Sequence, residues 1–381
     1  MTHNNDSTAA STQVGAASPY RSPLLDLDGA VEAAGAGVAD HYGAPLREGR
    51  ALADGRAFVD LSHFGVVTVT GPDRLSWLHS LSSQALTGLP EGTSTRTLFL
   101  DLQGRIEFDA RVVDQGGTAY LILEPGLAAG LAAWLDSMRF MLRVEVADVS
   151  ERWAVLATGG EWPADAAAAA SSGIEWVDPW PDIPAGGYPY GPVEDHPGFE
   201  TERRLVLVPR ESLTIVAQAL QEAGWRPAGL DAYEQVRIAA WQPSQAHEMD
   251  NKSIPHELDL LRSAVHLNKG CYKGQETVAR VHNLGHPPRR LVFLDLDGME
   301  HTVPAAGSAV MADGRKVGTV TSSVLHHDAG PIALAVIRRA VDPGLELSVV
   351  DGETSYTAAQ TVIVAPEAGS VVGRPQGIKR L

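Results

Sequence analysis

Residues 269–276 read Lys-Gly-Cys-Tyr-Lys-Gly-Gln-Glu, and this stretch is the most informative part of the chain. Cys271 is the single cysteine among 381 residues, so a disulfide within the chain is excluded. Lys269 and Lys273 place positive charge near the sulfur, which favours the thiolate. Residues 275–281 look helical, and a helix N-terminus near the sulfur stabilises a thiolate further. The stretch therefore predicts a free thiol kept for its chemistry.

Two glycines flank this thiol. Gly270 and Gly274 allow backbone conformations, and close approach of a ligand, that other residues would block. The alternative for a lone cysteine is a buried side chain that acts as a small apolar group. The charged, glycine-flanked setting favours the reactive interpretation over the inert one.

The chain as a whole is acidic, with a formal net charge of −17. Such a surface repels nucleic-acid phosphate and anionic lipid. The chain has no long basic run, since Arg289-Arg290 and Lys379-Arg380 are too short to form a local basic patch. No stretch reaches the roughly eighteen apolar residues of a membrane span. We therefore expect no direct nucleic-acid binding and no membrane insertion. Residues 1–22 are predicted to be a disordered leader without export features, which together with one cysteine indicates a cytoplasmic protein.

The N-terminal part predicts mixed helices and strands. Strands are expected at 64–70, within 97–113, at 120–123 and at 204–208, and helices after Pro72 and over 127–138, 212–223 and 230–241. Residues 106–113 alternate apolar and polar side chains, as a half-buried strand does. Residues 159–202 contain an alanine run and several prolines, and we expect a loop-rich insertion there.

The sequence pattern changes from Arg290 onwards. Short β-rich runs at 291–296, 316–325, 332–338 and 346–350 are separated by Gly, Asp and Pro. This spacing predicts a small all-β C-terminal domain, either a barrel or a sandwich.

Three spaced motifs carry a family resemblance. Residues 269–276 resemble the signature of the YgfZ-type folate-binding proteins, which are relatives of the aminomethyltransferase (T protein) of glycine cleavage. The opening of both families is similar to residues 59–65 followed by 69–73. Residues 227–238 resemble the helix that precedes the folate-site loop. The resemblance covers roughly residues 40 to 340.

The resemblance implies an α+β, multi-domain fold around a central tetrahydrofolate channel, with a C-terminal all-β barrel domain. Residues 23–287 would form the folate-binding region from two interleaved subdomains, including the loop-rich insertion. Residues 288–381 would form the barrel domain and a flexible tail.

The resemblance also implies a role in assembling or repairing iron–sulfur enzymes, with indirect effects on tRNA modification. The functional cysteine of the family corresponds to Cys271. Its signature neighbours, which we expect at the folate site, are Lys269, Gly270, Tyr272, Gly274, Gln275 and Glu276.

Departures from the aminomethyltransferase pattern argue against glycine cleavage. The strand of those enzymes that corresponds to 104–113 carries two adjacent acids, whereas this chain has Phe108-Asp109. Their Gly-Tyr-Thr-Gly-Glu segment is absent, and residues 191–195 are at most a distorted remnant of it. The aminomethyltransferases also lack the Lys-Gly-Cys-Tyr motif.

Three further charged residues are candidates for the channel, each with an ordinary alternative. Asp109 is predicted to be a channel carboxylate that orients the folate amine, or else a solvent-facing strand acid. Glu257 is a candidate for a hydrogen bond to the pterin, or else an exposed acid in the first turn of a helix. Arg237 is a candidate for bidentate contacts to the glutamate carboxylates of folate, or else a salt-bridge residue.

We expect no stable metal site. His282 and His286 have the spacing of one helix face and His326-His327 are adjacent, but neither pair has a third ligand at recognisable spacing. One cysteine cannot hold an iron–sulfur cluster alone, although it can supply one ligand to a cluster shared with a partner.

Three functions stay open at this point. The first is a folate-binding accessory protein that serves iron–sulfur client or assembly proteins. The second is a tetrahydrofolate-dependent one-carbon transferase that moves an aminomethyl or methyl group. The third is a protein-binding scaffold with a vestigial channel. Tetrahydrofolate is the expected cofactor of the first two.

Overall fold

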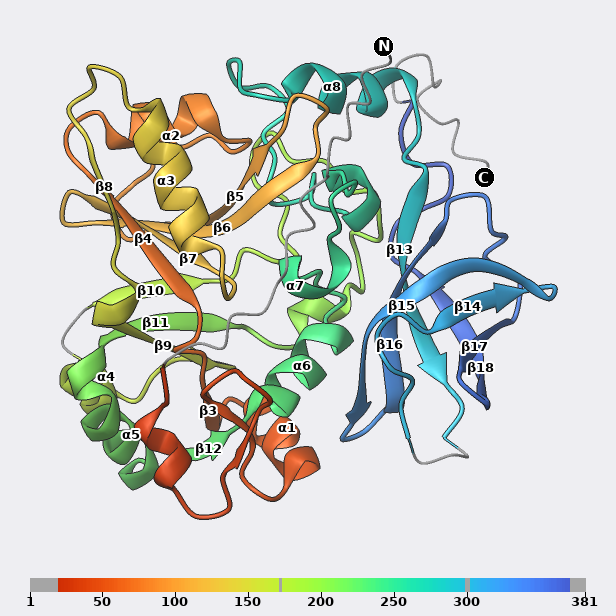
Figure 1. Cartoon of the computed structure of the whole chain (residues 1–381), viewed down its shortest axis with the longest axis horizontal. Helices are drawn as coiled ribbons and strands as arrows, with labels where there is room; N and C mark the ends of the chain where they lie inside the picture. Colours follow the sequence, from red (N-terminus) through yellow and green to blue (C-terminus); the bar gives the residue numbers. More distant parts are fainter. Residues whose placement is uncertain (1–19, 171–172, 299–301, 371–381) are drawn as a thin grey trace, which may run out of the picture.

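Two five-stranded sheets build the N-terminal region, and a barrel stands beside them (Figure 1). The computed structural model describes residues 20–170, 173–298 and 302–370. Most of the predicted leader and the end of the predicted tail lie outside the described residues. The described chain starts at Tyr20, and Ser22 is already buried, so the last residues of the predicted leader belong to the folded region.

The first sheet has the strand order β10-β11-β9-β3-β12, in which only β12 and β3 pair in parallel. Its strands are β3 (Ala57–Asp60), β9 (Trp153–Thr158), β10 (Ile174–Val177), β11 (Arg204–Pro209) and β12 (Arg226–Ala228). Apolar side chains on one face pack against α4 (Ala164–Ala170) and α5 (Leu213–Glu222). The other face packs against the second sheet. Helices α1 (Pro45–Ala53) and α6 (Leu230–Ala239) lie at its β12 edge.

The second sheet has the order β5-β6-β7-β4-β8, and all its pairs are antiparallel. Its strands are β4 (Gly65–Thr70), β5 (Ser94–Leu100), β6 (Ile106–Gln115), β7 (Thr118–Leu123) and β8 (Glu145–Asp148). Helices α2 (Arg74–Leu81) and α3 (Ala128–Met138) pack on its outer face. The chain leaves the first sheet after β3, completes the second sheet, and returns with β9, so the two sheets interleave in sequence.

The C-terminal part is a closed six-stranded barrel with the order β13-β16-β15-β14-β17-β18. Its strands are β13 (Arg289–Leu296), β14 (Ala309–Ala312), β15 (Arg315–His326), β16 (Gly330–Arg338), β17 (Leu347–Asp351) and β18 (Thr354–Val362). The predicted α+β fold with an all-β barrel domain is therefore confirmed. Two barrel strands, β14 and β18, were not predicted.

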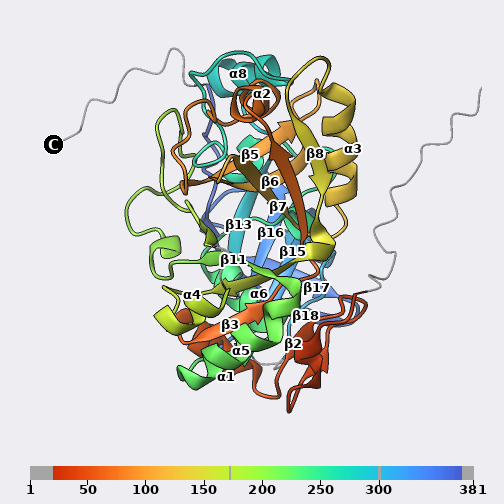
Figure 2. The same ribbon diagram turned by 90° about the vertical axis from the view of Figure 1, so that its left-hand side faces the viewer.

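Short elements complete the described chain. A two-stranded ribbon pairs β1 (Val31–Glu32) with β2 (Ala39–His41), and two helices in the second half are α7 (Gln245–Glu248) and α8 (Gln275–Leu284). The 3-10 turns are Pro23–Asp26, Ser150–Arg152, Pro197–Phe199, Arg210–Ser212 and Pro255–Leu258. In both Figure 1 and Figure 2, α8 lies at one end of the molecule and α1 at the other. No helix in the described ranges is long and apolar enough to cross a membrane.

The predicted loop-rich insertion differs from the structure at the alanine run, which forms helix α4. Alanine has the highest helix propensity, and α4 gains a packing surface from α5. Residues 174–177 add strand β10 to the edge of the first sheet.

Candidate functional site

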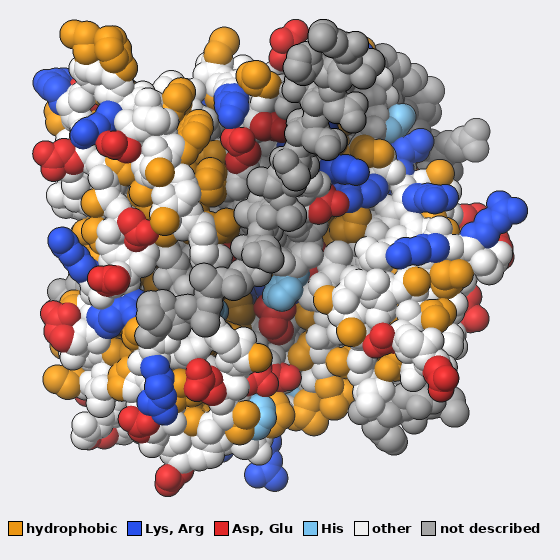
Figure 3. All heavy atoms as spheres, viewed as in Figure 1, with side chains coloured by type: hydrophobic (Ala, Val, Ile, Leu, Met, Phe, Trp, Pro, Cys, Tyr) orange, Lys and Arg blue, Asp and Glu red, His pale blue; other side chains and the backbone are white. Residues whose placement is uncertain are grey.

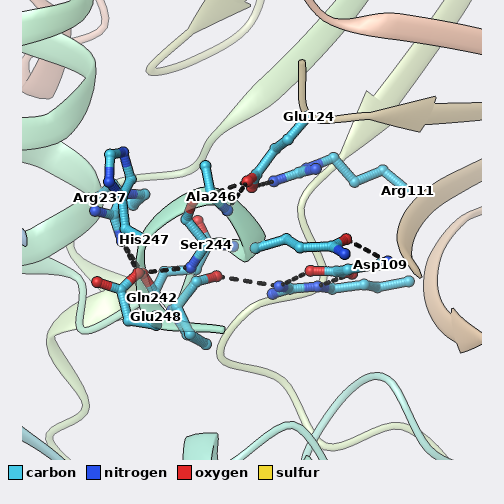
Figure 4. A network of polar contacts seen from close by, with 12 residues as sticks. Asp109, Arg111, Glu124, Arg237, Gln242, Ser244, Ala246, His247 and Glu248 are labelled. Atoms are coloured by element: carbon cyan, nitrogen blue, oxygen red, sulfur yellow. Dashed lines mark hydrogen bonds and ion pairs between the residues drawn. The ribbon is translucent and has the colours of Figure 1, made fainter. Parts of the chain in front are cut away.

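A buried polar network surrounds residues 242–248, which comprise the end of the α6–α7 connection and α7 itself (Figure 4). Charged side chains reach this segment from β5 (Arg96), from the residue after β7 (Glu124) and from α6 (Arg237), and each finds a partner there. Unpaired charges are costly to bury, so the pairing is what allows them to lie in the interior. The segment therefore joins the second sheet, α6 and the barrel in one place.

Glu124 follows β7 and forms the first part of this network. Arg111 Nη2 donates to Glu124 Oε1 at 2.9 Å, while Oε2 accepts from Ser244 Oγ at 2.9 Å and from the Ala246 amide at 2.6 Å. Burial by itself raises the pKa of the Glu124 carboxyl, but the Arg111 charge and these hydrogen bonds outweigh it and lower the pKa to about 2. Glu124 is thus a fixed, ionised carboxylate.

Glu248 links the network to the barrel. Arg237 Nη1 and the Ser244 amide both donate to Glu248 Oε2, each at 2.8 Å. Its other oxygen accepts from Thr321 Oγ1 at 2.8 Å and from Ser322 Oγ at 2.7 Å, and both of these residues belong to β15. Arg237 therefore forms a buried salt bridge, which was the alternative to its predicted contact with folate.

Asp109 is 1% exposed, so the prediction of a solvent-facing strand acid is wrong. Arg96 Nε donates to Asp109 Oδ1 at 2.8 Å, and Arg96 Nη2 donates to Oδ2. The same guanidinium reaches the Pro243 carbonyl at 3.1 Å, and the Asp109 amide donates to Gln245 Oε1 at 2.8 Å. The polar face of β6 is buried because residues 242–248 cover it. Both oxygens of Asp109 are engaged by Arg96, so a role in contact with folate stays a prediction.

Phe108 lies on the opposite face of β6 from Asp109, since successive side chains of a strand alternate. It packs with the core cluster under α3, next to Gly130. An acid at position 108 would therefore face that cluster and not the network. The absence of an acid there says little about the chemistry on the Asp109 side.

A small cavity of about 130 Å³ opens beside this network. Its lining combines apolar and titratable side chains: Leu61, His63, Phe64, Glu124, Pro125, Leu230, Tyr233, Glu234, Ser244, Ala246 and His247. A second cavity of about 530 Å³ shares His63 and Phe64 with the first. The two cavities meet at these two residues, which follow β3.

His63, which lines both cavities, carries one of several buried side-chain atoms that have no hydrogen-bond partner in the described part of the chain. Its Nδ1 is buried and has no hydrogen-bond partner among the described residues. Burial lowers the pKa of His63 to about 4, although the Glu124 charge opposes this shift. The ring is therefore neutral at neutral pH. A buried polar atom without a partner is costly, so this nitrogen marks a place where a ligand can supply the missing hydrogen bond.

The signature stretch lies away from both cavities, and none of its residues lines either one. Lys269 Nζ donates to the Ser82 carbonyl at 2.6 Å, to the Gln84 carbonyl at 3.0 Å, and to the His79 carbonyl. These carbonyls lie at and just beyond the C-terminal end of α2, where a cation is favourable. The ammonium of Lys269 is thus directed at α2.

The rest of the signature stretch holds the loop in place. Tyr272 is buried in the core cluster between β5, α8 and the barrel. Lys273 Nζ pairs with Glu107 Oε2 at 3.0 Å, and Gln275 Nε2 donates to the Lys269 carbonyl at 3.1 Å. Gly274 has φ +84°, and a Cβ there would lie 2.5 Å from the Asp101 carbonyl oxygen.

Cys271 itself is exposed, three residues before the N-cap of α8. The predicted helix is confirmed at Gln275–Leu284. Glu276 is exposed in its first turn, and a Cβ on Gly270 would meet nothing within 4 Å. The loop thus presents a surface thiol, and folate contacts from the signature residues stay a prediction.

Glu257 is 1% exposed, so its predicted alternative as an exposed acid is wrong. Arg289, at the start of β13, donates to Glu257 Oε1 at 2.9 Å and to Oε2 at 2.8 Å. The pair therefore ties the Pro255–Leu258 turn to the barrel.

Metal-binding side chains do not gather anywhere in the part of the chain that the structure describes: no group of three or more His, Cys, Asp or Glu residues there has the geometry to hold an ion. His282 Nδ1 lies 3.1 Å from the Tyr190 hydroxyl, and His286 Nδ1 lies 2.7 Å from the Ala368 carbonyl oxygen. These two histidines therefore have separate hydrogen-bond partners.

Two segments of the chain match known protein domains. Residues 30–172 match the GCVT N-terminal domain, and residues 289–364 match the glycine cleavage T-protein C-terminal barrel domain. In a solved structure, the aminomethyltransferase T of the glycine cleavage system of Bartonella henselae is similar to this fold with a TM-score of 0.69. That likeness covers 90% of this chain and 95% of the other at 20% sequence identity.

Curated relatives are similar over most of their length. A chloroplastic protein of Arabidopsis thaliana, whose name describes a transferase without a substrate, is 28% identical over 81% of this chain and 73% of its own. The aminomethyltransferase of Moorella thermoacetica is 29% identical over 81% of this chain and 86% of its own. The aminomethyltransferase of Nostoc sp. is 28% identical over 76% and 79%.

Proposed function

The chain belongs to the glycine cleavage T-protein superfamily, whose N-terminal and C-terminal barrel domains both match it, and on this premise we propose that it binds tetrahydrofolate in the cavity between His63 and Glu124. We propose further that it is an accessory protein of the YgfZ type, which acts in iron–sulfur cluster assembly or repair through Cys271. Effects on tRNA modification then follow indirectly, through iron–sulfur enzymes that modify tRNA.

The unpartnered Nδ1 of His63 is the observation that carries the folate proposal. A reduced pterin is a flat bicycle with hydrogen-bonding groups on its edge. Leu61, Phe64 and Tyr233 supply apolar walls, while the unpartnered Nδ1 of His63 supplies a polar atom for that edge. The residues present therefore fit the group. Tetrahydrofolate would supply a carrier for one-carbon units at this place.

Size also favours this arrangement. The cavity of about 130 Å³ is small, so it suits the pterin head and not a whole folate molecule. The adjoining cavity of about 530 Å³ shares His63 and Phe64 and offers room for the remainder. His63 would thus contact the ligand where the two cavities meet, and its neutral ring can donate or accept one hydrogen bond.

The accessory role is supported by the separation of thiol and cavity. Cys271 is exposed on a loop that Lys269 and Tyr272 fix to the protein, and it lines neither cavity, so its sulfur is accessible to a partner protein. One thiolate can complete the coordination of a cluster whose other ligands come from a client or assembly protein.

A complementation experiment tests the accessory role. In a strain that lacks the protein, Cys271→Ala is expected to fold normally and yet fail to restore the activity of iron–sulfur enzymes. Cys271→Ser is the matched control for size, and we expect it to fail as well, because a hydroxyl is a poor cluster ligand. Full rescue by Cys271→Ala contradicts the proposal.

A one-carbon transferase is the second candidate, favoured by the aminomethyltransferase names of several relatives. Against it stands Asp109, whose two carboxylate oxygens both accept hydrogen bonds from Arg96. Incubation of the purified protein with labelled methylene-tetrahydrofolate and amine acceptors discriminates between the two. Transfer of label over repeated turnovers would establish the transferase.

A further inference from the structure

A cavity of about 510 Å³ at the α1 end of the molecule is lined by four arginines. The complete lining is Leu46, Arg47, Arg50, Ala51, Asp54, Arg56, Gly224, Arg226 and His327. It shares no residue with the two cavities of the proposed folate site. Figures 1 and 2 show α1 at the end of the molecule opposite α8, so the cavity is also remote from the signature loop.

The local fold explains why these arginines meet. Arg47 and Arg50 are three residues apart on α1, so they lie on one face of that helix. Arg56 precedes β3 and Arg226 begins β12, and these strands pair in parallel, with the Arg226 amide donating to the Arg56 carbonyl at 3.0 Å. A helix and two neighbouring chain segments therefore bring their guanidinium groups to one hollow.

The charge of this hollow is positive in an acidic chain. Arg56 pairs with Asp54 at 2.6 Å, and Arg50 pairs with Asp328 at the rim. Arg47 and Arg226 have no acidic partner among the residues described, so four arginines and two acids leave a formal charge of +2. The net charge of the whole chain is −17. On the face shown in Figure 3, basic and acidic side chains are intermixed over most of the surface.

One wall of the cavity is rigid. The side chain of His327 is only 6% exposed, and its Nδ1 lies 3.1 Å from Gln235 Oε1. Gln235 Nε2 in turn donates to the Pro45 carbonyl at 3.1 Å and to Asp231 Oδ1 at 2.6 Å. Gly49 makes this possible, because a Cβ there would lie 2.0 Å from Gln235 Oε1. The β15–β16 turn is thereby fixed against α1 and α6.

We propose that this arginine-lined cavity binds a small molecule that carries two or more linked phosphate groups. Guanidinium groups form bidentate, charge-assisted hydrogen bonds with phosphate oxygens, and Arg47 and Arg226 are available for them. The groups come from separate chain segments, which suits tetrahedral phosphates whose oxygens point in several directions. The volume lies in the range of small-molecule sites, and Leu46 and Ala51 offer apolar contact for the remainder of the ligand.

A nucleic acid fits less well, because the net charge of the chain repels a long polyanion beyond the cavity. This site goes beyond the proposed folate function and does not depend on it.

Calorimetric titration of the full-length protein with sodium tripolyphosphate tests the proposal. The variant Arg47→Gln/Arg226→Gln removes the two arginines without acidic partners. The matched control Arg105→Gln/Arg280→Gln removes the same charge from two exposed arginines outside the cavity. We expect saturable one-site binding that the cavity variant weakens at least about tenfold and the control less than about twofold, since specific contacts outweigh the general field.

Two results with tripolyphosphate would overturn the proposal. One is an absence of saturable binding to the unmodified chain. The other is an equal loss of affinity in both double variants, which would mean that tripolyphosphate senses only the overall charge. Citrate, a compact tricarboxylate, is titrated in the same way to compare the two classes of anion. If citrate binds as tightly as tripolyphosphate, the assignment of the cavity to phosphates is refuted. Thermal melts of each variant verify that all of them are folded.

Discussion

Lys269 Nζ lies 2.6 Å from the carbonyl oxygen of Ser82, and this contact joins the signature loop to the end of α2. Two more carbonyls, from His79 and Gln84, accept from the same ammonium. The lysine next to the thiol therefore holds the loop in position. Its charge acts first on the end of α2, whose carbonyls would otherwise lack partners.

Lys269→Met is accordingly expected to lower the free energy of unfolding by about 2 kcal/mol, because it removes charge-assisted hydrogen bonds from partly buried carbonyls. Urea denaturation measures this. Lys273→Met is the matched control: its side chain and that of its partner Glu107 are 31% and 37% exposed, so solvent screens the pair and the loss should stay below about 1 kcal/mol. Equal stability of the two variants would show that the Lys269 contacts contribute nothing.

The two glycines of the signature are expected to differ. Gly274→Ala places a Cβ against the Asp101 carbonyl at a residue with φ +84°, so it should destabilise the protein by at least about 2 kcal/mol. Gly270→Ala meets no atom within 4 Å and should change stability by less than about 0.5 kcal/mol. Thermal melts of both variants give the comparison. The reverse order of melting temperatures would contradict the described loop conformation.

Asp109→Asn is expected to cost about 3–5 kcal/mol, since it leaves the Arg96 guanidinium buried without its counter-charge. The double variant Arg96→Met/Asp109→Leu removes both charges and should recover much of this loss. Chemical denaturation of the unmodified chain, the single variant and the double variant measures both changes in the free energy of unfolding. A stable Asp109→Asn protein that lacks only activity would instead assign Asp109 a catalytic role.

Glu124 gives a prediction for pH. Its pKa in the folded chain, about 2, lies below its ordinary value of 4.5, so the folded state binds this proton less readily than the unfolded state. The stability that Glu124 contributes is therefore complete above about pH 4.5 and is lost as the pH falls towards about 2, a change of about 3 kcal/mol.

Denaturation of the unmodified chain and of Glu124→Gln at several pH values measures this contribution. The stability difference between them should shrink as the pH falls from about 5 to about 3. A difference that stays constant over this range would mean that Arg111 does not stabilise the ionised carboxylate.

Local patterns predicted the second sheet except β8, four barrel strands and the helices α2, α3, α5, α6 and α8, but only β11 of the first sheet, and not the site. The helix after Gly274 and the β5–β6 hairpin follow from spacing and turn residues within a few positions. Strand β18 was missed because exposed polar side chains interrupt its apolar pattern. The burial of Asp109 depends on Gln245, which lies 136 residues further along the chain. The sequence around Asp109 therefore contains no pattern that predicts this burial.

The same reason applies to the residues around the cavity. His63 lies within a motif that resembles the family opening, yet its unpartnered nitrogen becomes visible only when Glu124 and residues 242–248 are in place. Cys271 shows the opposite case. Its neighbours in sequence suggested a thiolate beside two free lysines, whereas in the structure both ammonium groups have other partners.

Titration of the protein with tetrahydrofolate under anaerobic conditions tests the central claim most directly. The account predicts saturable binding to the unmodified chain and to Cys271→Ala with the same affinity within about twofold, because the thiol lies outside the cavity. His63→Phe keeps a flat aromatic ring, although a larger one, and removes the buried nitrogen. It should weaken binding at least about tenfold without loss of stability. No binding to the unmodified chain, or binding that Cys271→Ala abolishes and His63→Phe leaves intact, would contradict the account.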